Sequence, residues 1–534
     1  AKIALPEGLS EIPASMFYGC QTVEEIVIPS TVASIGNKAF FGCSNLKSLI
    51  FTETPEGQTP VDLVILDTPN GSSNNGYTNS PFYGCTSLKN IVLPERLTVI
   101  GRLAFGGLVS GRYGEKYIPP FESISLPSTL KEIHEMAFLN ARNLKTVTFA
   151  SGTTLSDACD GKAFAIGKQA FYYCTSLTEI ALPTSSEATY SIGDTAFAYT
   201  GLKEISIPKA VGWLGSGVFN RSSDLAKAVF EAGANPKCGT SLFAYTAVSG
   251  VTLPEGVEAI SNYMFQGCVN LTSVTVPASV KSIGISAFES CQALAKVTFA
   301  TYEKDGKSYS NLISIDNYAF SKTGITSFTF PTLEGTKTLD LGNSLFRSCM
   351  KLETVGLSES VAEIGTAFAD CFSIRSFVVD ENNENFSSKP GSPILYNATG
   401  TAYMYICGQL PAGEYVIPEG IVSIGDNVFK GQVGITKVVI PRSMQTIGNY
   451  AFSGCTLLET VVFEHSTDKP SQLTQKDSYG TNMFRECTSL KDVTLPANMT
   501  VIPANMFYGC KALESIVIPY GVTSIGQDAF GYAG

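Results

Sequence analysis

The sequence IVIPSTVASIGNKAFFGC at residues 26–43 decides the fold of this 534-residue chain. It returns as VTVPASVKSIGISAFESC at residues 274–291 and as VVIPRSMQTIGNYAFSGC at residues 438–455. The shared pattern is L-x-x-I-x-I-P-x-x-V-x-x-I-G-x-x-A-F-x-G-C. Its phenylalanine marks 19 repeat units, at Phe17, Phe40, Phe82, Phe105, Phe138, Phe171, Phe197, Phe219, Phe243, Phe265, Phe288, Phe320, Phe346, Phe368, Phe429, Phe452, Phe484, Phe507 and Phe530.

The repeat predicts a solenoid whose basic turn has about 23 residues. The segment L-x-x-I-x-I alternates with period two, which is typical of a strand with one buried face. The proline after it ends the strand because it has no N–H to donate. We expect the glycine of Ile-Gly to serve a tight corner, and the Ala-Phe-x-x-Cys segment to return with a large and then a small side chain inside. One turn cannot bury its own apolar side, so the turns must stack on each other.

The pattern resembles the BspA-type (Treponema pallidum-type) leucine-rich repeats of bacterial and protozoan surface proteins. Residues 380–417 resemble a hairpin module that interrupts the repeats in that family. The resemblance implies an α/β-type repeat solenoid, a right-handed superhelix with a long parallel sheet on its concave face, about 19 turns and few regular helices. We expect residues 1–534 to form this one domain, with the module inserted. The resemblance also implies a secreted or surface location, a role in adhesion, and no catalytic residues.

Composition narrows the classes of partner. The net charge is −11 and the pI is about 5.0, which argues against nucleic acid or an anionic membrane as the main partner. No run of 18 apolar residues occurs, so we expect no membrane insertion. The chain begins and ends inside a repeat, which suggests a fragment whose targeting segment lies outside it. We expect a monomer.

The cysteines follow the repeat rather than a metal-binding or disulfide pattern. Eleven of the 14 lie three residues after the repeat phenylalanine, and other turns place Thr, Ala or Ser there. A position that accepts these residues favours a small buried side chain. No C-x-x-C occurs, so we expect no metal and no cofactor. Cys159, Cys238 and Cys407 lie outside this column, and their state is left open.

Insertions between turns carry the candidate binding residues. Tyrosine is favoured at interfaces, and insertions in solenoids tend to map to one face. Residues 304–307, Lys-Asp-Gly-Lys, predict a hairpin turn inside one insertion. The candidate ligand-binding residues are Tyr113, Tyr117, Tyr302, Tyr309, Tyr396, Tyr403, Tyr405 and Tyr415. The alternative is that these insertions are surface loops whose tyrosines pack on the solenoid.

The outward columns of the sheet are chemically plain. The residue after the central strand isoleucine is Thr or Val in most turns, and it is never charged or aromatic. This face offers no convergent acid, base or nucleophile, so we expect no enzyme. Together with the adhesive role that the family resemblance implies, we expect a non-catalytic adhesin for a matrix or cell-surface protein. A passive stalk that displays another domain and a glycan-binding module remain alternatives.

Overall fold

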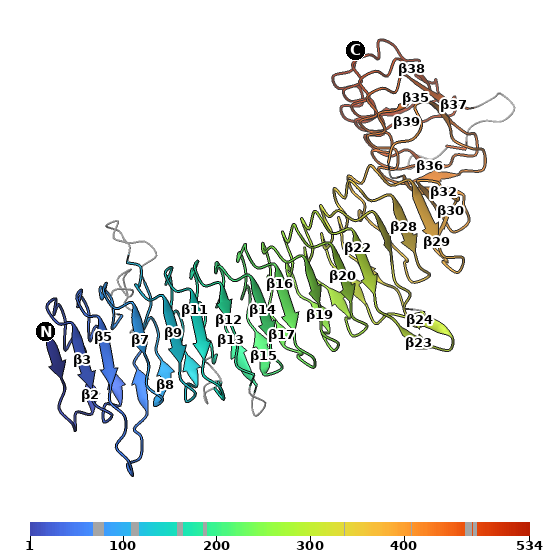
Figure 1. Ribbon diagram of the computed structural model, residues 1–534. Coiled ribbons are helices and arrows are strands. Elements are labelled where there is room, and N and C mark those ends of the chain that lie inside the picture. The colour runs from blue at the N-terminus through green and yellow to red at the C-terminus, as the bar shows by residue number, and fades with distance from the viewer. Residues whose placement is uncertain are drawn as a thin grey trace. The chain divides into compact units, whose positions relative to one another are not determined.

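The computed structural model describes residues 1–67, 80–107, 117–156, 164–184, 189–335, 337–406, 408–464, 472–473 and 478–534. The chain forms two compact units, Ala1–Thr323 and Gly324–Gly534, here called unit 1 and unit 2. Each is a stack of turns in which successive strands lie side by side (Figure 1). The described part of the chain contains strands and turns but no helix. A β-solenoid of leucine-rich repeats is thus confirmed, with about 21 turns against the expected 19.

The alternating segment of each turn forms the first strand of a parallel ladder. In the turn of Phe40 this strand is β3 (Glu25–Ile28), which pairs in parallel with β1 (Lys2–Ala4) and β5 (Ser48–Phe51). Ile26 and Ile28 are buried, whereas Val27 points outward. Exposed residues of the same column include Val92 and Val517. The outward Thr and Val column is therefore confirmed.

The other first-ladder strands repeat this arrangement with similar lengths. In unit 1 they are β7 (Asn90–Val92), β9 (Ser123–Leu126), β11 (Thr146–Phe149), β12 (Glu179–Ile180), β14 (Glu204–Ile207), β16 (Lys227–Phe230), β18 (Gly250–Thr252), β20 (Ser273–Val276) and β22 (Lys296–Phe299). In unit 2 they are β26 (Ser327–Thr329), β28 (Thr354–Leu357), β29 (Ser376–Val379), β33 (Gly413–Val416), β35 (Ile435–Ile440), β37 (Thr460–Phe463) and β38 (Asp492–Thr494). Within the described residues, strand pairing in unit 1 breaks between β5 and β7 and between β12 and β14, where additional residues separate the turns.

A second, shorter ladder runs along each unit, and the sequence did not reveal it. Its strands cover the Ser-Ile of Ser-Ile-Gly, so most have only two residues, too few for a periodicity to show. In unit 1 they are β2 (Glu11–Ile12), β4 (Ser34–Ile35), β6 (Leu63–Ile65), β8 (Leu97–Ile100), β10 (Glu132–Ile133), β13 (Tyr190–Ile192), β15 (Val211–Leu214), β17 (Lys237–Cys238), β19 (Ala259–Ile260), β21 (Ser282–Ile283) and β25 (Ser314–Ile315). In unit 2 they are β27 (Asp340–Leu341), β34 (Ser423–Ile424), β36 (Thr446–Ile447), β39 (Val501–Ile502) and β40 (Ser524–Ile525).

The repeat phenylalanines form the core. Phe138 and Phe171 stack with ring centroids 4.8 Å apart, and Phe265 and Phe288 stack at 5.4 Å. We call the segment that carries this phenylalanine, from the end of the second-ladder strand to the next first-ladder strand, the return leg. Its backbone also pairs with the next turn, because the Phe265 N–H donates to the Ala287 carbonyl at 2.8 Å. Side-chain stacking and backbone pairing therefore hold neighbouring turns at one spacing.

The two glycines of the repeat serve different purposes. The glycine of Ile-Gly lies between the second-ladder strand and the return leg, and Gly36 has no left-handed φ, but a Cβ there would lie 2.7 Å from the Ala14 nitrogen of the preceding turn. Close approach of two backbones selects this glycine. The glycine of Gly-Cys does need the left-handed region, as at Gly42 with a φ of 73°.

The core predicts a large cost for breaking the phenylalanine ladder. Phe452→Ala, at a fully buried position, should lower the free energy of unfolding by about 3–5 kcal/mol through lost burial and a cavity. Phe372→Ala, at a position 52% exposed, is the control and should cost much less. Urea denaturation measures both. Equal losses for the two variants would show that the ladder is not what stabilises unit 2.

Candidate functional site

The cysteine column has a structural role that its exchange with serine reflects. Cys268 donates its S–H to the Phe243 carbonyl of the preceding turn at 3.1 Å, and Cys455 does the same to Phe429 at 3.1 Å. Ser222 donates to Phe197 in the equivalent way at 2.9 Å. The thiol thus fills a small space and satisfies a buried carbonyl. Among the column cysteines, burial is confirmed for all but Cys20, which lies half-exposed in the first turn.

Of the three cysteines outside the column, Cys238 lies among the described residues. Cys238 is half-buried and has a free thiol, and burial raises its pKa to about 12. Cys159 and Cys407 lie outside the described residues.

The structure separates the tyrosines predicted to bind a ligand. Tyr117, Tyr396 and Tyr403 are buried, and the Tyr117 hydroxyl donates to the Phe82 carbonyl at 3.0 Å. Tyr113 lies outside the described residues. A buried ring can contact a ligand only after the surrounding chain moves, so these positions pack the solenoid in the structure as it stands.

The other four candidates are half-exposed. Tyr302 and Tyr309 face each other across the hairpin of β23 (Tyr302–Lys304) and β24 (Lys307–Tyr309), which confirms the hairpin turn expected at residues 304–307. Tyr415 lies with its hydroxyl 3.2 Å from that of Tyr403. Tyr405 lies in a cleft.

The cleft arises because the inserted module forms a layer without an ordinary return leg. The module comprises the antiparallel strands β30 (Phe386–Ser388), β31 (Ile394–Asn397) and β32 (Ala402–Ile406). Tyr403 of β32 pairs with Ile424, and Tyr415 pairs with Val438. In the next turn 14 positions separate Ile424 from Val438, whereas 12 separate Tyr403 from Tyr415. Part of this shorter segment is extended strand, so too few residues remain to form a return leg like those of the neighbouring turns.

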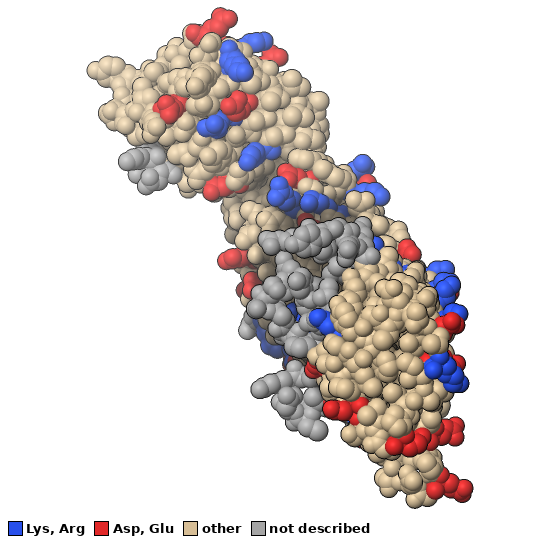
Figure 2. All heavy atoms as spheres, turned by 90° about the vertical axis from the view of Figure 1, so that its left-hand side faces the viewer, with Lys and Arg blue, Asp and Glu red and all other residues tan. Residues whose placement is uncertain are grey.

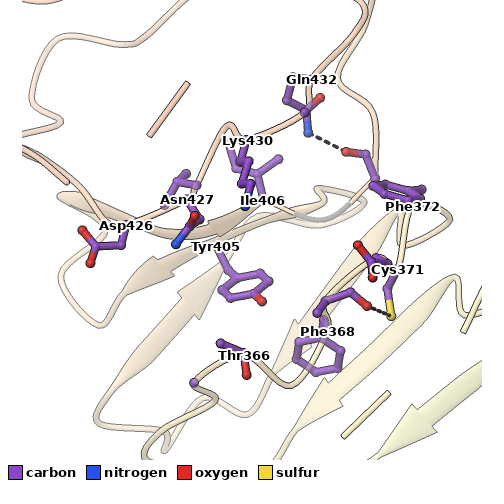
Figure 3. Close-up of a pocket in the computed structure, with 16 residues that line it drawn as sticks. Thr366, Phe368, Cys371, Phe372, Tyr405, Ile406, Asp426, Asn427, Lys430 and Gln432 are labelled. Atoms are coloured by element: carbon purple, nitrogen blue, oxygen red, sulfur yellow. Dashed lines mark hydrogen bonds between the residues drawn. The ribbon is translucent and has the colours of Figure 1, made fainter. Parts of the chain in front are cut away.

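The cleft occupies about 640 Å³ in unit 2. That volume falls within the range of about 300–1,000 Å³ that small-ligand pockets occupy. Residues 365–372 form one wall and residues 426–432 the other, and Tyr405, Ile406 and Gly408 of the module lie between them. In Figure 3 the Tyr405 ring points into the space between Phe368 and the opposite wall. The two rings are 6.1 Å apart with 77° between their planes, so Tyr405 covers the Phe368 ring where the phenylalanine ladder is interrupted.

A second candidate surface lies on the return legs of unit 1. The Tyr173 and Tyr199 rings stack at 4.6 Å, Arg142 lies 5.5 Å above Tyr173, and Arg221 lies between Tyr199 and Tyr245 at 6.0 and 4.7 Å. We call these five residues the Tyr–Arg row. In the described part of the chain neither guanidinium forms an ion pair with a carboxylate. The row ends at Gly267, where a Cβ would lie 2.5 Å from the Tyr245 ring.

The backbone of the row has left-handed φ values, which do not favour Tyr or Arg. Tyr173, Tyr199, Arg221 and Tyr245 have φ values of 63°, 58°, 58° and 60°. A residue with a Cβ loses roughly 1–2 kcal/mol in this left-handed region, and glycine avoids that loss. Other turns place glycine in the same column, as at Gly19 and Gly454. Ser290, Lys322 and Asp370 of the same column also have left-handed φ values, so this strain is general to the column, and what distinguishes the row is the choice of Tyr and Arg in successive turns.

The sequence contained a signal for the row that the repeat consensus obscured. Reading the column two residues after the repeat phenylalanine gives Tyr173, Tyr199, Arg221 and Tyr245 in consecutive turns. Only Arg142 falls outside that column. The sequence signal for the cleft is weaker, because the cleft depends on strand pairings that only the structure shows.

The described residues include a charged cluster around His134. His134 lies between Asp67 at 2.7 Å and Glu132 at 2.9 Å, and these carboxylates raise its pKa to about 9. Within the described ranges no set of three His, Cys, Asp or Glu side chains is arranged to hold a metal ion. Nor does that part of the chain contain a helix long and apolar enough to cross a membrane. Basic and acidic side chains are interspersed on the face in Figure 2.

A known repeat family matches most of the chain. The BspA type leucine rich repeat region, a six-copy family description, matches residues 1–57, 68–113, 115–164, 158–271, 236–332, 258–390 and 403–533. The chain belongs to the BspA-type leucine-rich repeat family. Membership supports a protein-binding role for this BspA-type protein.

Three solved structures are similar to parts of this chain at low identity. A leucine-rich repeat protein from Eubacterium ventriosum is 23% identical, with 54% of this chain and 83% of that chain covered and a TM-score of 0.39. A leucine rich cell surface protein from Faecalibacterium prausnitzii is 21% identical, with 65% and 86% covered and a TM-score of 0.37. The leucine-rich repeat protein of T. pallidum is 23% identical, with 46% and 75% covered and a TM-score of 0.22. No curated protein matches the chain.

The buried thiols should be unreactive in the folded protein. Burial raises the pKa of Cys174 to about 12 and that of Cys268 to about 11, so their thiolates are scarce at pH 8. Brief alkylation at pH 8 followed by peptide mapping should label Cys20. Cys174 and Cys268 should stay unlabelled until the chain is denatured. In the unfolded chain these thiols ionise near pH 9, whereas in the folded chain they stay protonated to higher pH. Ionisation therefore favours the unfolded chain, and the free energy of unfolding should also fall above about pH 9. Labelling of Cys268 at the rate of Cys20 would contradict this.

His134 should make stability depend on pH over a defined window. Its folded pKa of about 9 exceeds the ordinary value of 6.5, so its contribution is complete below about pH 6.5 and is lost as the pH rises through 9. The melting temperature of His134→Gln should therefore lie further below that of the parent at pH 6 than at pH 9.5. An equal difference at both values would show that the two carboxylates do not hold the histidine charged.

Proposed function

We propose that this BspA-type protein is a secreted or cell-surface adhesin that binds a matrix or cell-surface protein without catalysing a reaction. The Tyr–Arg row carries the proposal. Tyrosine and arginine are the residues most enriched among those that dominate interface energies. The row presents three of one and two of the other, ordered by mutual stacking before any partner arrives. The proposal treats residues 1–534 as one repeat domain that acts as a monomer.

The geometry of the row favours a protein partner over a glycan. Sugar recognition by stacking needs an open aromatic face, but the Tyr173 and Tyr199 rings cover one another at 4.6 Å, and Arg142 and Arg221 lie over their other faces. What remains accessible is ring edges, hydroxyls and guanidinium N–H groups. Guanidinium groups that meet no carboxylate within the described chain suit acidic side chains on a partner.

The alternatives have less support from the described residues. A passive stalk does not require Tyr and Arg in successive turns of one column, where other turns place glycine, serine or aspartate. Catalysis would require convergent acid, base or nucleophilic groups, and the carboxylates and histidine of the Asp67–His134–Glu132 cluster are already bonded to each other. We keep Tyr302 and Tyr309 as proposed secondary contacts on their hairpin.

Removing two rings of the row should weaken binding and leave the fold intact. In Tyr199→Gly combined with Tyr245→Gly, relief of roughly 1–2 kcal/mol of backbone strain per site offsets the lost ring contacts and the greater freedom of glycine when unfolded. We therefore expect a nearly unchanged melting temperature. Binding to immobilised extracellular-matrix proteins or to cell-surface proteins should weaken by about tenfold or more.

Tyr318→Gly is the matched control for this variant. Tyr318 also has a left-handed φ, 59°, and is 38% exposed, close to the 43% of Tyr245, but it lies in a different column. It should bind like the parent. If the control weakens binding as much as the double variant, the row is not the site. If the parent binds no protein of either class, the passive stalk replaces the adhesin.

A further inference from the structure

The cleft in unit 2 interrupts a backbone pattern that holds neighbouring return legs together. In the turn after it, the N–H groups of Asn427, Phe429 and Gly431 donate to the carbonyls of the next leg at 2.9, 2.7 and 2.9 Å. These donors lie two residues before the repeat phenylalanine, at it, and two residues after it. The same central bond recurs at Phe346, Phe452, Phe484 and Phe507. Each return leg therefore acts like a strand paired in parallel with the next.

The leg before the cleft has no such partner. Its equivalent donors are the N–H groups of Thr366, Phe368 and Asp370, and none of them meets an acceptor among the described residues. The three donors lie on one wall of the cleft, which includes these residues. They are unpaired because the module's shortened layer does not extend a return leg over them.

The opposite wall carries the complementary set. By the same pattern the carbonyls of Asp426, Val428 and Lys430 should each accept a bond from a preceding leg, and none does so within the described chain. These residues also line the cleft. One wall thus offers alternate donors and the other alternate acceptors, in the register that a single polypeptide segment presents along its two edges.

We propose that this cleft binds a short peptide segment of a partner protein, which completes the missing return leg by pairing its backbone with both walls. Main-chain pairing of an added segment is an established mode of peptide recognition, in which side chains then decide specificity. An unpaired backbone group in a hollow gains more from such a bond than an exposed one, because little water remains around it. The site lies apart from the Tyr–Arg row and does not depend on it.

The side chains in the cleft define which segment fits. Tyr405 occupies the core position of this layer, so the inward residue of the segment must be small, such as Ala, Ser or Gly. The charged groups at the rim already have contacts of their own. Asp370 pairs with Arg347 at 3.4 Å, the Asp426 carboxylate accepts the Asn449 N–H, and the Lys430 ammonium lies 5.7 Å over the Tyr450 ring. The cleft therefore selects through backbone geometry and small size rather than through charge.

The test uses a peptide whose sequence is taken from a return leg of this chain. The probe is the acetylated and amidated hexapeptide Asn-Tyr-Ala-Ala-Ser-Gly, which follows residues 449–454 with alanine in place of phenylalanine. The full chain is mixed with it, and amide hydrogen exchange is followed at Phe368 and Asp370, with Phe429 as the paired reference. At ten times the dissociation constant, exchange at the two cleft amides should slow on the order of tenfold, since it proceeds from the unoccupied fraction.

Two methylated peptides of identical composition separate backbone pairing from other binding. N-methylation of the fourth residue removes a donor that should face the 426–430 wall, and it should abolish the slowing. N-methylation of the third residue alters an N–H that faces neither wall, and it should leave the slowing intact. The variant Tyr199→Gly with Tyr245→Gly should respond to the probe like the parent, so failure of the adhesin proposal would not affect this result.

Several outcomes would overturn the inference. Exchange at Phe368 that is already as slow as at Phe429 without peptide would show that the cleft is closed. Slowing that grows with protein concentration alone would assign the cleft to a second copy of the chain. Equal effects of the two methylated peptides, or no slowing up to the solubility limit of the probe, would exclude recognition through the backbone.

Discussion

Every turn of this protein must fit against a neighbour built to the same plan, and that constraint governs the rest of the structure. Two strand ladders and the paired return legs fix the separation of successive turns, so each side chain meets its equivalent from the next turn. A column must therefore consist of residues that stack on themselves. Phenylalanine does so with ring centroids 4.8 Å apart at Phe138 and Phe171. Thr and Val do so on the outward face, where β-branched side chains suit a pleated surface.

The same constraint explains residues that otherwise resemble functional motifs. The cysteine column would suggest redox or metal chemistry, yet its thiols bond to the phenylalanine carbonyls of the preceding turn, as Cys268 does to Phe243. The glycine of Ile-Gly would suggest a corner, yet it marks the point where two backbones approach too closely for a Cβ. Both columns serve the contact between turns, which is why they recur along the chain.

Function is expected where a column departs from what stacking alone requires. In the Tyr–Arg row, four successive turns place Tyr or Arg in a column that elsewhere holds glycine or short and charged residues. At the inserted module, a layer lacks its return leg and leaves two edges of backbone unpaired. The first departure adds side chains that interfaces favour, and the second opens a hollow of about 640 Å³. Both lie on the return legs, whereas the outward sheet columns remain uniform.

The sequence by itself determined the elements that repeat. The spacing of phenylalanine fixed the turn, the alternation of Ile26 and Ile28 fixed the first ladder, and Asp305-Gly306 fixed a hairpin, because these signals are local and periodic. Only the tertiary structure decided the second ladder, the reason for Gly36, the burial of Tyr117, Tyr396 and Tyr403, and the cleft beside Tyr405. Each of these depends on which residues of adjacent turns meet. Insertions change the sequence offset between neighbours, so that the stacked pair Phe197 and Phe219 is 22 positions apart but the stacked pair Phe40 and Phe82 is 42 apart. A contact across turns is therefore set by pairing in space, which no spacing along the chain specifies.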